Sequence, residues 1–494
     1  MPNILEEIVR RRRADLEKLG PAFGAEAPSV RTRPVVPFLS RVGTILEIKR
    51  SSPSKGAIAM GLDPERTAKL YAQAGTQGIS VLTERNFFNG SLKDLQIAAK
   101  AAPDCSILRK DFLLEEEEIE IAYKFGADAV LLIARILNEE KLLKMAARAR
   151  KYGMTPFIEV RTESDAEILR HAALEGNVVA GVNSRDLANF HIDPLIPAAF
   201  RKELPCRAIF ESGVEVPGDA AFARKLGFEG ILIGEAAARN PENAAALVKA
   251  FGDAEPDREG EFWKRIAERR EAHKRTQPGR PLVKICGIRT ENEGMLAAAL
   301  GADLLGFVFS KSPRNADAES VRKITAAVHG KFPEVLFCGV ITDPESEQGK
   351  CALALAEKGT LDAVQFHGCA IPPMIQKTPF ACYPAVRIGE AKHVEDLLTS
   401  WKSGTPRTLI DAKVEGIFGG TGTRIPAELV HKVALQMPLW LAGGIGPENV
   451  RAIMDRFHPE LIDVSSRLES APGVKDAEKV KVLFKEINGA KDRS

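Results

Sequence analysis

Short runs of apolar residues recur along the chain, and segments with the spacing of amphipathic helices separate them. The runs are apolar on both faces, which is typical of parallel strands covered by helices. The first half contains eight of these runs, and we predict a strand in each. They span residues 44–49, 78–84, 105–111, 127–134, 155–160, 178–183, 207–212 and 230–235.

The second half repeats this alternation without repeating the sequence. Eight alternating strands and helices favour a closed (β/α)8 barrel over a doubly wound sheet, and one such barrel usually takes roughly 250 residues. Because the chain has 494 residues, we predict two tandem (β/α)8 TIM barrels of the α/β class. The second set of runs spans residues 282–286, 302–310, 335–341, 362–368, 383–388, 407–412, 438–444 and 461–466.

Two segments stand outside this alternation. Residues 1–19 have apolar residues at helical spacing, which predicts an extra N-terminal amphipathic helix whose arginines at 10–13 form a solvated face. About half of residues 253–280 are charged, which indicates a linker that is partly helical. We therefore predict a first domain over residues 1–252 and a second domain over residues 281–494.

The charge, the cysteine spacing and the apolar runs of the chain limit the binding partners and the cellular compartment that we expect. The 69 basic and 67 acidic residues leave a formal charge of +2, so no long-range field favours nucleic acid or an anionic membrane. The seven cysteines are scattered without CxxC spacing, which favours a reducing cytoplasm over a zinc site or a disulfide framework. The sequence has no export signal and no apolar run long enough to span a membrane. We expect a cytoplasmic protein without metal or cofactor, and a monomer is compatible with the sequence.

Ionisable residues collect at the carboxyl ends of the predicted strands in the first half, where (β/α)8 barrels place their active sites. Any one of them alone is more often part of an ion pair in the barrel core. Together they indicate acid–base chemistry without a metal, because burial and opposite charges shift lysine and glutamate pKa values. The set is Glu47, Lys49, Lys110, Glu159, Asn183, Arg185, Glu211 and Ser212.

The loops after the last two predicted strands of the first half carry glycines. Barrels commonly bind phosphate at this place through backbone N–H groups, although a single glycine there can simply form a turn. The candidates for phosphate binding are Gly213, Gly234 and Glu235.

The strand-end motifs of the first half resemble those of the indole-3-glycerol-phosphate synthase family over about residues 1–250. The resemblance implies closure of a carboxyphenylaminodeoxyribulose phosphate to indole-glycerol phosphate, with release of carbon dioxide and water. The motifs are, in order, ILEIKRSSPSKG, TERNFFNGS, ILRKDFLL, FIEV, GVNSRDL, ESGV and LIGEA.

This resemblance also implies roles for single residues. Lys110 resembles the general acid that polarises the substrate carbonyl, Glu159 resembles the acid/base of the dehydration, and Lys49 would pair with the substrate carboxylate or assist the dehydration. How these three divide the proton transfers stays open. Phe88, Phe112 and Leu131 would form an apolar wall for the anthranilate ring, with ordinary core packing as the alternative. The residues that would orient the substrate are Glu47, which we place with the catalytic set, and Asn183, Arg185, Glu211 and Ser212.

The motifs of the second half resemble those of the phosphoribosylanthranilate isomerase family over about residues 282–490. The resemblance implies an Amadori-type rearrangement, which opens the ribose ring and moves a proton to leave a ketone. The motifs are VKICGIRT, GFVFSKSPR, VQFHG, LIDAK with FGGTGT, LAGGIGPENV, and DVSS with PGVKD.

The rearrangement needs an acid at the ring oxygen and a base at the neighbouring carbon. Asp411 resembles the acid and Cys286 the base, and we expect nearby positive potential to favour the Cys286 thiolate. A cysteine without this context is more often an inert core residue. Arg314 would hold the anthranilate carboxylate, and Gln365 and His367 would line the pocket.

A second phosphate cradle is implied by the same resemblance, and we assign Asp463, which lies close to it, no role. Arg467 stands where this family usually has glycine, which makes the local backbone geometry an open point. The residues of the cradle are Gly420, Gly443, Gly444, Ser465 and Ser466.

The two implied reactions follow one another, because the product of the second barrel is the substrate of the first. We therefore predict consecutive steps of tryptophan synthesis on one chain, acting on small phosphorylated substrates derived from anthranilate. The alternative is that only one barrel is catalytic and the other binds a phosphometabolite or serves as a scaffold. RNA binding through arginines 10–13 and the basic linker lacks the aromatic residues that such a surface uses.

Overall fold

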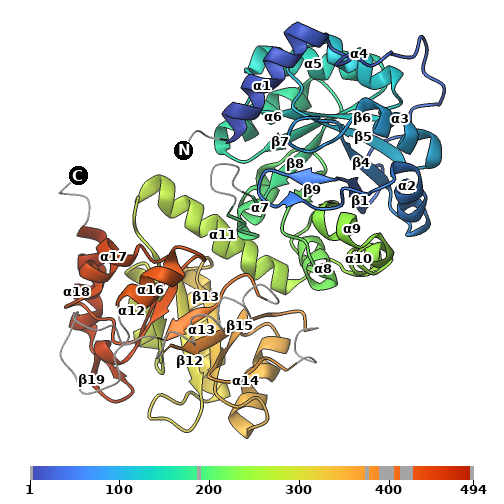
Figure 1. Cartoon of the computed structure of the whole chain (residues 1–494). Helices are drawn as coiled ribbons and strands as arrows, with labels where there is room; N and C mark the ends of the chain where they lie inside the picture. The colour runs from blue at the N-terminus through green and yellow to red at the C-terminus, as the bar shows by residue number, and fades with distance from the viewer. Residues whose placement is uncertain (1–3, 186–190, 373–377, 389–404, 412–426, 490–494) are drawn as a thin grey trace. The chain divides into compact units, whose positions relative to one another are not determined.

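Both predicted barrels are present in the computed structural model (Figure 1). The chain divides into two compact units, residues 1–256 and 257–494, and each is described by itself. Each unit contains one closed barrel of eight parallel strands, which confirms the predicted fold class. The structure describes residues 4–185, 191–372, 378–388, 405–411 and 427–489.

Each strand of the first barrel falls on one of the predicted apolar runs, and the barrel closes where β1 pairs with both β4 and β10. The strands are β1 (Gly43–Ile48), β4 (Gly78–Leu82), β5 (Ser106–Lys110), β6 (Ala129–Ile133), β7 (Thr155–Val160), β8 (Val179–Asn183), β9 (Ala208–Glu211) and β10 (Gly230–Ile233). The helices are α1 (Ile4–Leu19), α2 (Pro64–Gln73), α3 (Leu92–Ala101), α4 (Glu117–Lys124), α5 (Glu139–Lys151), α6 (Glu163–Leu174), α7 (Leu195–Phe200), α8 (Pro217–Lys225), α9 (Glu235–Arg239) and α10 (Ala244–Asp253). A short hairpin, β2 (Ser51–Ser52) and β3 (Gly56–Ala57), follows β1.

The second barrel has the same order of elements and closes where β11 pairs with β12 and β18. Its strands are β11 (Leu282–Cys286), β12 (Leu304–Phe309), β13 (Leu336–Ile341), β14 (Ala363–His367), β15 (Ala381–Arg387), β16 (Leu409–Asp411), β17 (Trp440–Ala442) and β18 (Leu461–Val464). The helices described are α11 (Arg258–Thr276), α12 (Glu291–Ala299), α13 (Ala318–Lys331), α14 (Glu347–Glu357), α16 (Ala427–Ala434), α17 (Val450–Phe457) and α18 (Ala477–Asn488). A hairpin of β19 (Glu469–Ala471) and β20 (Val474–Lys475) follows β18.

Capping side chains fix where many of the helices begin. In the first barrel Ser91 accepts a hydrogen bond from the backbone N–H of Asp94 at the start of α3. In the second barrel Thr290 and Glu293 form a reciprocal capping box at the start of α12. Each cap satisfies N–H groups that have no partner within the helix. These caps therefore define where the loops after the strands end and the helices begin.

Helix α11 lies at the end of the second barrel where the strands begin. Its Trp263 is fully buried, with the ring centroid 6.4 Å from that of Tyr383 on β15 and 5.9 Å from that of Trp440 on β17. Arg269 pairs with Asp303, just before β12, and Arg270 pairs with a carboxylate just before β18. The segment expected to be a linker thus contains a helix of the second unit.

The expected linker boundaries differ from the division in the structure, which falls between Pro256 and Asp257. The charged composition of residues 253–280 indicated a linker that is partly helical. In the structure several of its arginines meet carboxylates that lie at the start of barrel strands. Sequence composition does not show such partners, because they are distant in the chain.

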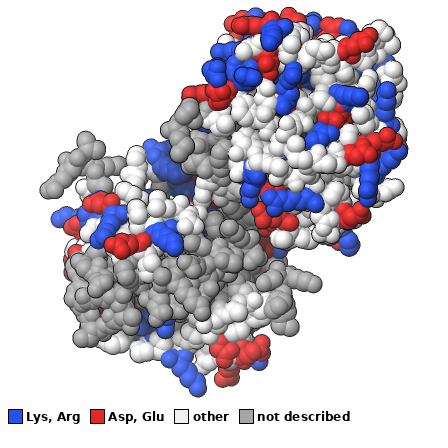
Figure 2. Space-filling model, viewed as in Figure 1, with Lys and Arg blue, Asp and Glu red and all other residues white. Residues whose placement is uncertain are grey.

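The surface carries both signs of charge. On the face shown in Figure 2, basic and acidic side chains are interspersed over the described residues. Among the helices described here, none is both long and apolar enough to cross a bilayer.

We expect Trp263→Ala to lower the free energy of unfolding of the second unit by about 3–5 kcal/mol, because it removes a buried indole from the aromatic cluster. Urea unfolding followed by tryptophan fluorescence measures this, since all three tryptophans lie in the second unit. Lys274→Ala on the same helix is the control, because that side chain is 60% exposed. An unchanged midpoint for Trp263→Ala would show that α11 is not part of the second core.

Candidate active sites

One pocket at the carboxyl ends of the first barrel's strands brings together every residue predicted for that half. Its walls also include residues that the sequence reasoning missed, from α1 and from the β2–β3 hairpin. The predicted residues in its wall are Glu47, Lys49, Phe88, Lys110, Phe112, Leu131, Glu159, Asn183, Arg185, Glu211, Ser212, Gly213, Gly234 and Glu235.

Lys110, at the end of β5, is the centre of the charges in this pocket. Its Nζ donates a hydrogen bond to Glu211 Oε2 and lies 4.0 Å from Glu159 Oε2. Burial opposes the lysine charge, but the three nearby glutamates outweigh burial and raise the pKa of Lys110 above its ordinary value. Burial, with repulsion from Glu159 and Glu47, raises the pKa of Glu211 to about 7 despite the lysine. The cluster therefore holds a charged lysine beside a carboxyl group that exchanges a proton near neutral pH.

Glycines on neighbouring strands leave room for these carboxylates. A Cβ atom on Gly181 in β8 would lie 2.2 Å from Glu211 Oε1. A Cβ atom on Gly234 after β10 would lie 2.7 Å from Glu47 Oε1. Lys49 Nζ lies 3.5 Å from that same Glu47 oxygen. The sequence reasoning identified Gly234 only as a phosphate candidate and missed Gly181.

Part of the pocket wall is apolar. The rings of Phe88 and Phe112 lie 6.1 Å apart between centroids, and Lys49 Nζ lies 5.5 Å from the centroid of Phe88. Leu5 and Ile8 of α1 belong to the same apolar cluster. The N-terminal helix is therefore part of the pocket wall, which its amphipathic pattern alone did not indicate.

The two glycine-containing loops lie at one end of the pocket. Ser212 and Gly213 both have left-handed backbones, with φ of 70° and 76°. The Glu235 carboxylate pairs with Arg239 at 2.7 Å and with Lys55 at 3.7 Å. Because its side chain is engaged, Glu235 can offer a phosphate only its backbone N–H group.

Cys286, at the end of β11, is the candidate base of the second barrel and is 7% exposed. Burial raises its pKa to about 12, and the attraction of Lys284 offsets only part of this effect. The expected positive potential is present, because Lys284 and Lys475 both lower the pKa of Cys286, but these two cations do not determine the outcome. Burial and the nearby carboxylate of Asp463 outweigh the cations.

Asp411, at the end of β16, is the candidate acid. Its Oδ2 lies 3.3 Å from His367 Nε2 and 3.5 Å from Arg387 Nε. The hydrogen bond with His367 lowers the pKa of Asp411 below its ordinary value, so the carboxyl group is ionised at neutral pH. His367, expected only to line the pocket, thus contacts the candidate acid directly.

Gln365 lies in the barrel interior with its side chain 2% exposed. Its Oε1 accepts a hydrogen bond from Lys284 Nζ at 2.5 Å, and its Nε2 lies 3.4 Å from His367 Nδ1. Both ends of the Gln365 amide are engaged. Through Lys284 and His367, the amide links the surroundings of Cys286 to those of Asp411, so Gln365 does more than line a pocket.

Arg314 already holds a carboxylate of the protein. Its Nε and Nη2 donate to the two oxygens of Glu469 at 2.7 and 2.8 Å, and Lys475 Nζ lies 3.2 Å from Glu469 Oε1. These cations overcome burial and lower the pKa of Glu469 to about 2. A substrate carboxylate would therefore meet the Nη1 side of Arg314. The sequence reasoning missed Glu469, which lies 155 residues away.

The candidate phosphate residues of the second barrel lie around β17 and β18. Gly443 and Gly444 have left-handed backbones, with φ of 103° and 68°. Ser465 Oγ donates to the backbone oxygen of Cys286 at 3.0 Å, which ties this loop to the candidate base. Gly420 lies outside the described residues.

The departure at Arg467 has a structural explanation. Ser466 and Arg467 begin a short 3-10 helix, a conformation open to any L-residue. The Arg467 guanidinium lies 3.3 Å from Glu448. The backbone at position 467 therefore does not require glycine, which the phosphoribosylanthranilate isomerase family usually has there.

Comparison with known proteins identifies both halves. The family model for indole-3-glycerol phosphate synthase matches residues 5–250, and the model for N-(5'-phosphoribosyl)anthranilate (PRA) isomerase matches residues 283–486. The tryptophan biosynthesis protein TrpCF of Yersinia pestis is 30% identical over 90% of this chain and 84% of its own. The chain belongs to this two-domain family. It is a bifunctional enzyme of tryptophan biosynthesis, with a synthase barrel followed by an isomerase barrel.

Longer relatives match nearly the whole of this chain. The multifunctional tryptophan biosynthesis protein of Phanerodontia chrysosporium is 29% identical over 98% of this chain and 70% of its own. The chain spans 66% of the corresponding protein of Schizosaccharomyces pombe, also at 29% identity. Among solved structures, phosphoribosyl anthranilate isomerase from Thermotoga maritima has 32% identity and a TM-score of 0.36, covering 42% of this chain and 99% of its own.

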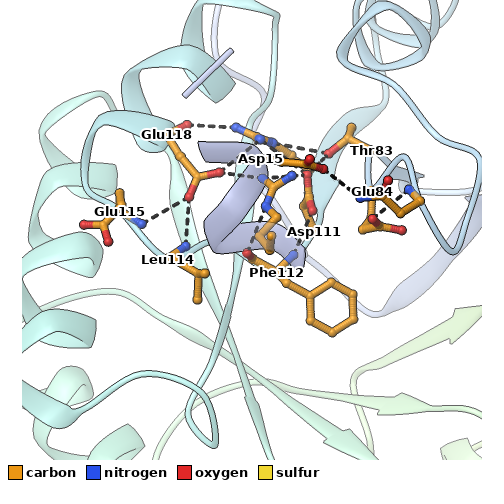
Figure 3. A network of polar contacts seen from close by, with 11 residues as sticks. Asp15, Thr83, Glu84, Asp111, Phe112, Leu114, Glu115 and Glu118 are labelled. Atoms are coloured by element: carbon orange, nitrogen blue, oxygen red, sulfur yellow. Dashed lines mark hydrogen bonds and ion pairs between the residues drawn. The ribbon is translucent and has the colours of Figure 1, made fainter. Parts of the chain in front are cut away.

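A buried network ties α1 to the pocket of the synthase barrel (Figure 3). Arg12 is 2% exposed, and its Nη2 lies 3.1 Å from Asp111 and 2.5 Å from Glu118. The expectation that arginines 10–13 all form a solvated face is therefore wrong for Arg12. Its partners follow β5, about 100 residues away, and the helical pattern could not show them.

The same helix contacts the loop after β4. Asn86 Nδ2 donates to Asp15 Oδ2 at 2.7 Å, and the Glu84 carboxylate accepts from the backbone N–H groups of residues 86, 87 and 88. Phe88 lies in this loop, and Phe112 follows the strand that carries Lys110. Helix α1 thus supports both aromatic residues of the pocket wall.

Arg12→Ala is expected to lower the stability of the synthase barrel by about 1.5–3 kcal/mol, because it removes charge-assisted contacts from two buried carboxylates that keep Arg109 as their other partner. Synthase activity should fall with it, while isomerase activity stays unchanged. Arg11→Ala removes an exposed arginine from the same helix and serves as the control. Equal behaviour of the two variants would contradict a supporting role for the network.

Gly181→Ala should reduce synthase kcat/KM by about 100-fold, because the new methyl group displaces the Glu211 carboxylate and misplaces Lys110. Isomerase activity measured on the same sample should not change. Gly218→Ala is the matched control, since an added Cβ atom there meets nothing within 4 Å. Full synthase activity in Gly181→Ala would show that the position of Glu211 does not matter.

Proposed function

We propose that the isomerase barrel converts N-(5'-phosphoribosyl)anthranilate to 1-(2-carboxyphenylamino)-1-deoxyribulose 5-phosphate, and that the synthase barrel closes this product to indole-3-glycerol phosphate. The observation that carries the proposal is the group of Lys110 and three glutamates facing an apolar wall in one pocket. Such a pocket suits a substrate with an aromatic ring, a carbonyl group and leaving groups that need protons. Location in the cytoplasm and a monomeric state remain expectations from the sequence.

In the synthase barrel, Lys110 is the general acid. Its charge polarises the substrate ketone while the ring carbon that bears the carboxylate attacks the carbonyl carbon. Carbon dioxide then leaves, and the electrons of the broken carbon–carbon bond stay in the ring. The former carbonyl oxygen becomes a hydroxyl group. Glu159 then assists loss of this hydroxyl as water, and Lys49 pairs with the substrate carboxylate or takes part in the dehydration.

The remaining predicted residues of the synthase pocket bind the substrate. Phe88, Phe112 and Leu131 contact the anthranilate ring. The polar orienting set includes Glu47 beside Lys49, with Asn183, Arg185, Glu211 and Ser212. Gly213, Gly234 and the backbone of Glu235 hold the phosphate.

In the isomerase barrel, Asp411 gives a proton to the ring oxygen as the ribose carbon–oxygen bond breaks. Cys286 removes the proton from the neighbouring carbon, and the resulting enol becomes the ketone of the product. These roles start from a thiolate and a carboxylic acid. Burial raises the pKa of Cys286 and the hydrogen bond with His367 lowers that of Asp411, so both shifts oppose these starting protonation states.

The substrate of the isomerase barrel is held at its two charged ends. The Nη1 side of Arg314 takes the anthranilate carboxylate, while His367 and Gln365 support Asp411. The phosphate is held by Gly443, Gly444, Ser465 and Ser466, with Gly420 as a further candidate.

Two variants test the proposal. Cys286→Ala should slow conversion of phosphoribosylanthranilate by about 100-fold or more and still process supplied intermediate, because only the isomerase base is lost. Lys110→Ala should accumulate that intermediate. Liquid chromatography of the reaction mixture measures both outcomes.

Cys351→Ala, a partly buried cysteine on α14, controls for loss of a thiol alone. If either variant loses both activities while folded, the two sites are not independent. If Cys286→Ala keeps full isomerase activity, Cys286 is not the base. The alternative with one catalytic barrel predicts that the wild-type chain carries out only one of the steps.

A further inference from the structure

The isomerase barrel contains a buried ion pair that the proposed reaction does not use. Lys284 is fully buried on β11, and its Nζ lies 2.8 Å from Asp463 Oδ2 on β18. The two residues are directly paired in the sheet. Moving two charges out of water costs several kcal/mol for each ion, and the attraction between them often does not exceed that cost. Barrel stability alone is therefore a weak explanation for this pair.

The pair lies next to the candidate base. Lys284 and Cys286 are two residues apart on β11, so both side chains are on the same face of the strand. A Cβ atom on Gly306, in the neighbouring strand β12, would lie 2.8 Å from Cys286 Sγ and 3.0 Å from Lys284 Cε. The sulfur and the lysine side chain thus both border the space that Gly306 leaves open.

We propose that Lys284 and Asp463 are positioning residues that act on the protonation of Cys286 in opposite directions. The lysine stabilises the thiolate, and the aspartate stabilises the thiol. Burial keeps the candidate base largely protonated, while the pair holds a cation beside it and Asp463 limits the effect of that cation. This inference rests on the proposed role of Cys286.

Other groups around Cys286 come from the elements packed against it. Lys475 on β20 adds positive charge, and Arg314 in the loop after β12 interacts with the thiol as well. Cys338 on β13 is a neutral neighbour that contacts Tyr383 of β15 at 3.1 Å. The signs of the effects on the Cys286 pKa agree with the proposal, since Lys284 lowers it and Asp463 raises it.

Neutralising each partner separately tests the proposal in the full-length chain. Alkylation of Cys286 by iodoacetamide is timed at pH 8, well below the thiol pKa, with mass spectrometry of the peptide that contains this cysteine. Lys284→Met should slow the reaction about tenfold, which corresponds to a pKa about one unit higher. Asp463→Asn should speed the reaction by a similar factor at the same pH.

Opposite shifts support the proposal, because a merely structural pair would affect both variants in the same direction. Shifts in the same direction, or no shift in either variant, overturn it. Lys284→Gln keeps side-chain polarity and replaces Lys284→Met if the latter does not fold, which urea unfolding reports. Isomerase activity against pH is measured separately. If alkylation shifts as expected and activity does not follow, the role of Cys286 as base is wrong while the effect of the pair stands.

Discussion

Each barrel holds a buried lysine paired with a carboxylate beside the residues to which we assign the chemistry. In the synthase barrel Lys110 contacts Glu211 and lies near Glu159, and in the isomerase barrel Lys284 pairs with Asp463. Charges buried in this way interact strongly, because little water screens them. They are therefore able to shift the pKa values of neighbouring groups, and both barrels have to provide space for them.

The two barrels differ in what their extra helices do. Helix α1 reaches the synthase pocket, where Arg12 joins it to the carboxylates after β5. Helix α11 lies where the strands of the isomerase barrel begin, and Trp263 extends the aromatic core there. One added helix thus shapes an active site and the other completes a core. Both use arginines to meet carboxylates at strand ends.

The strands and the strand-end residues could be predicted from the sequence because periodicity and order along the chain determine them. Contacts between distant residues could not. The partners of Arg12 lie about 100 residues away, and Glu469, which occupies one edge of Arg314, lies 155 residues away. The protonation of Cys286 depends on the balance between burial, Lys284 and Asp463, and only coordinates reveal that balance. The need for glycine at position 181 depends on where the Glu211 side chain lies, which the sequence does not show.

The proposed function requires one chain to carry out both steps in order. Its most direct test supplies the purified wild-type chain with phosphoribosylanthranilate labelled with carbon-13 in the anthranilate carboxylate and follows the label by NMR. The account predicts that the label passes through the rearranged intermediate and leaves as carbon dioxide, in step with formation of indole-3-glycerol phosphate. Label that stays in the starting compound, or that stops in the intermediate without release of carbon dioxide, would contradict it.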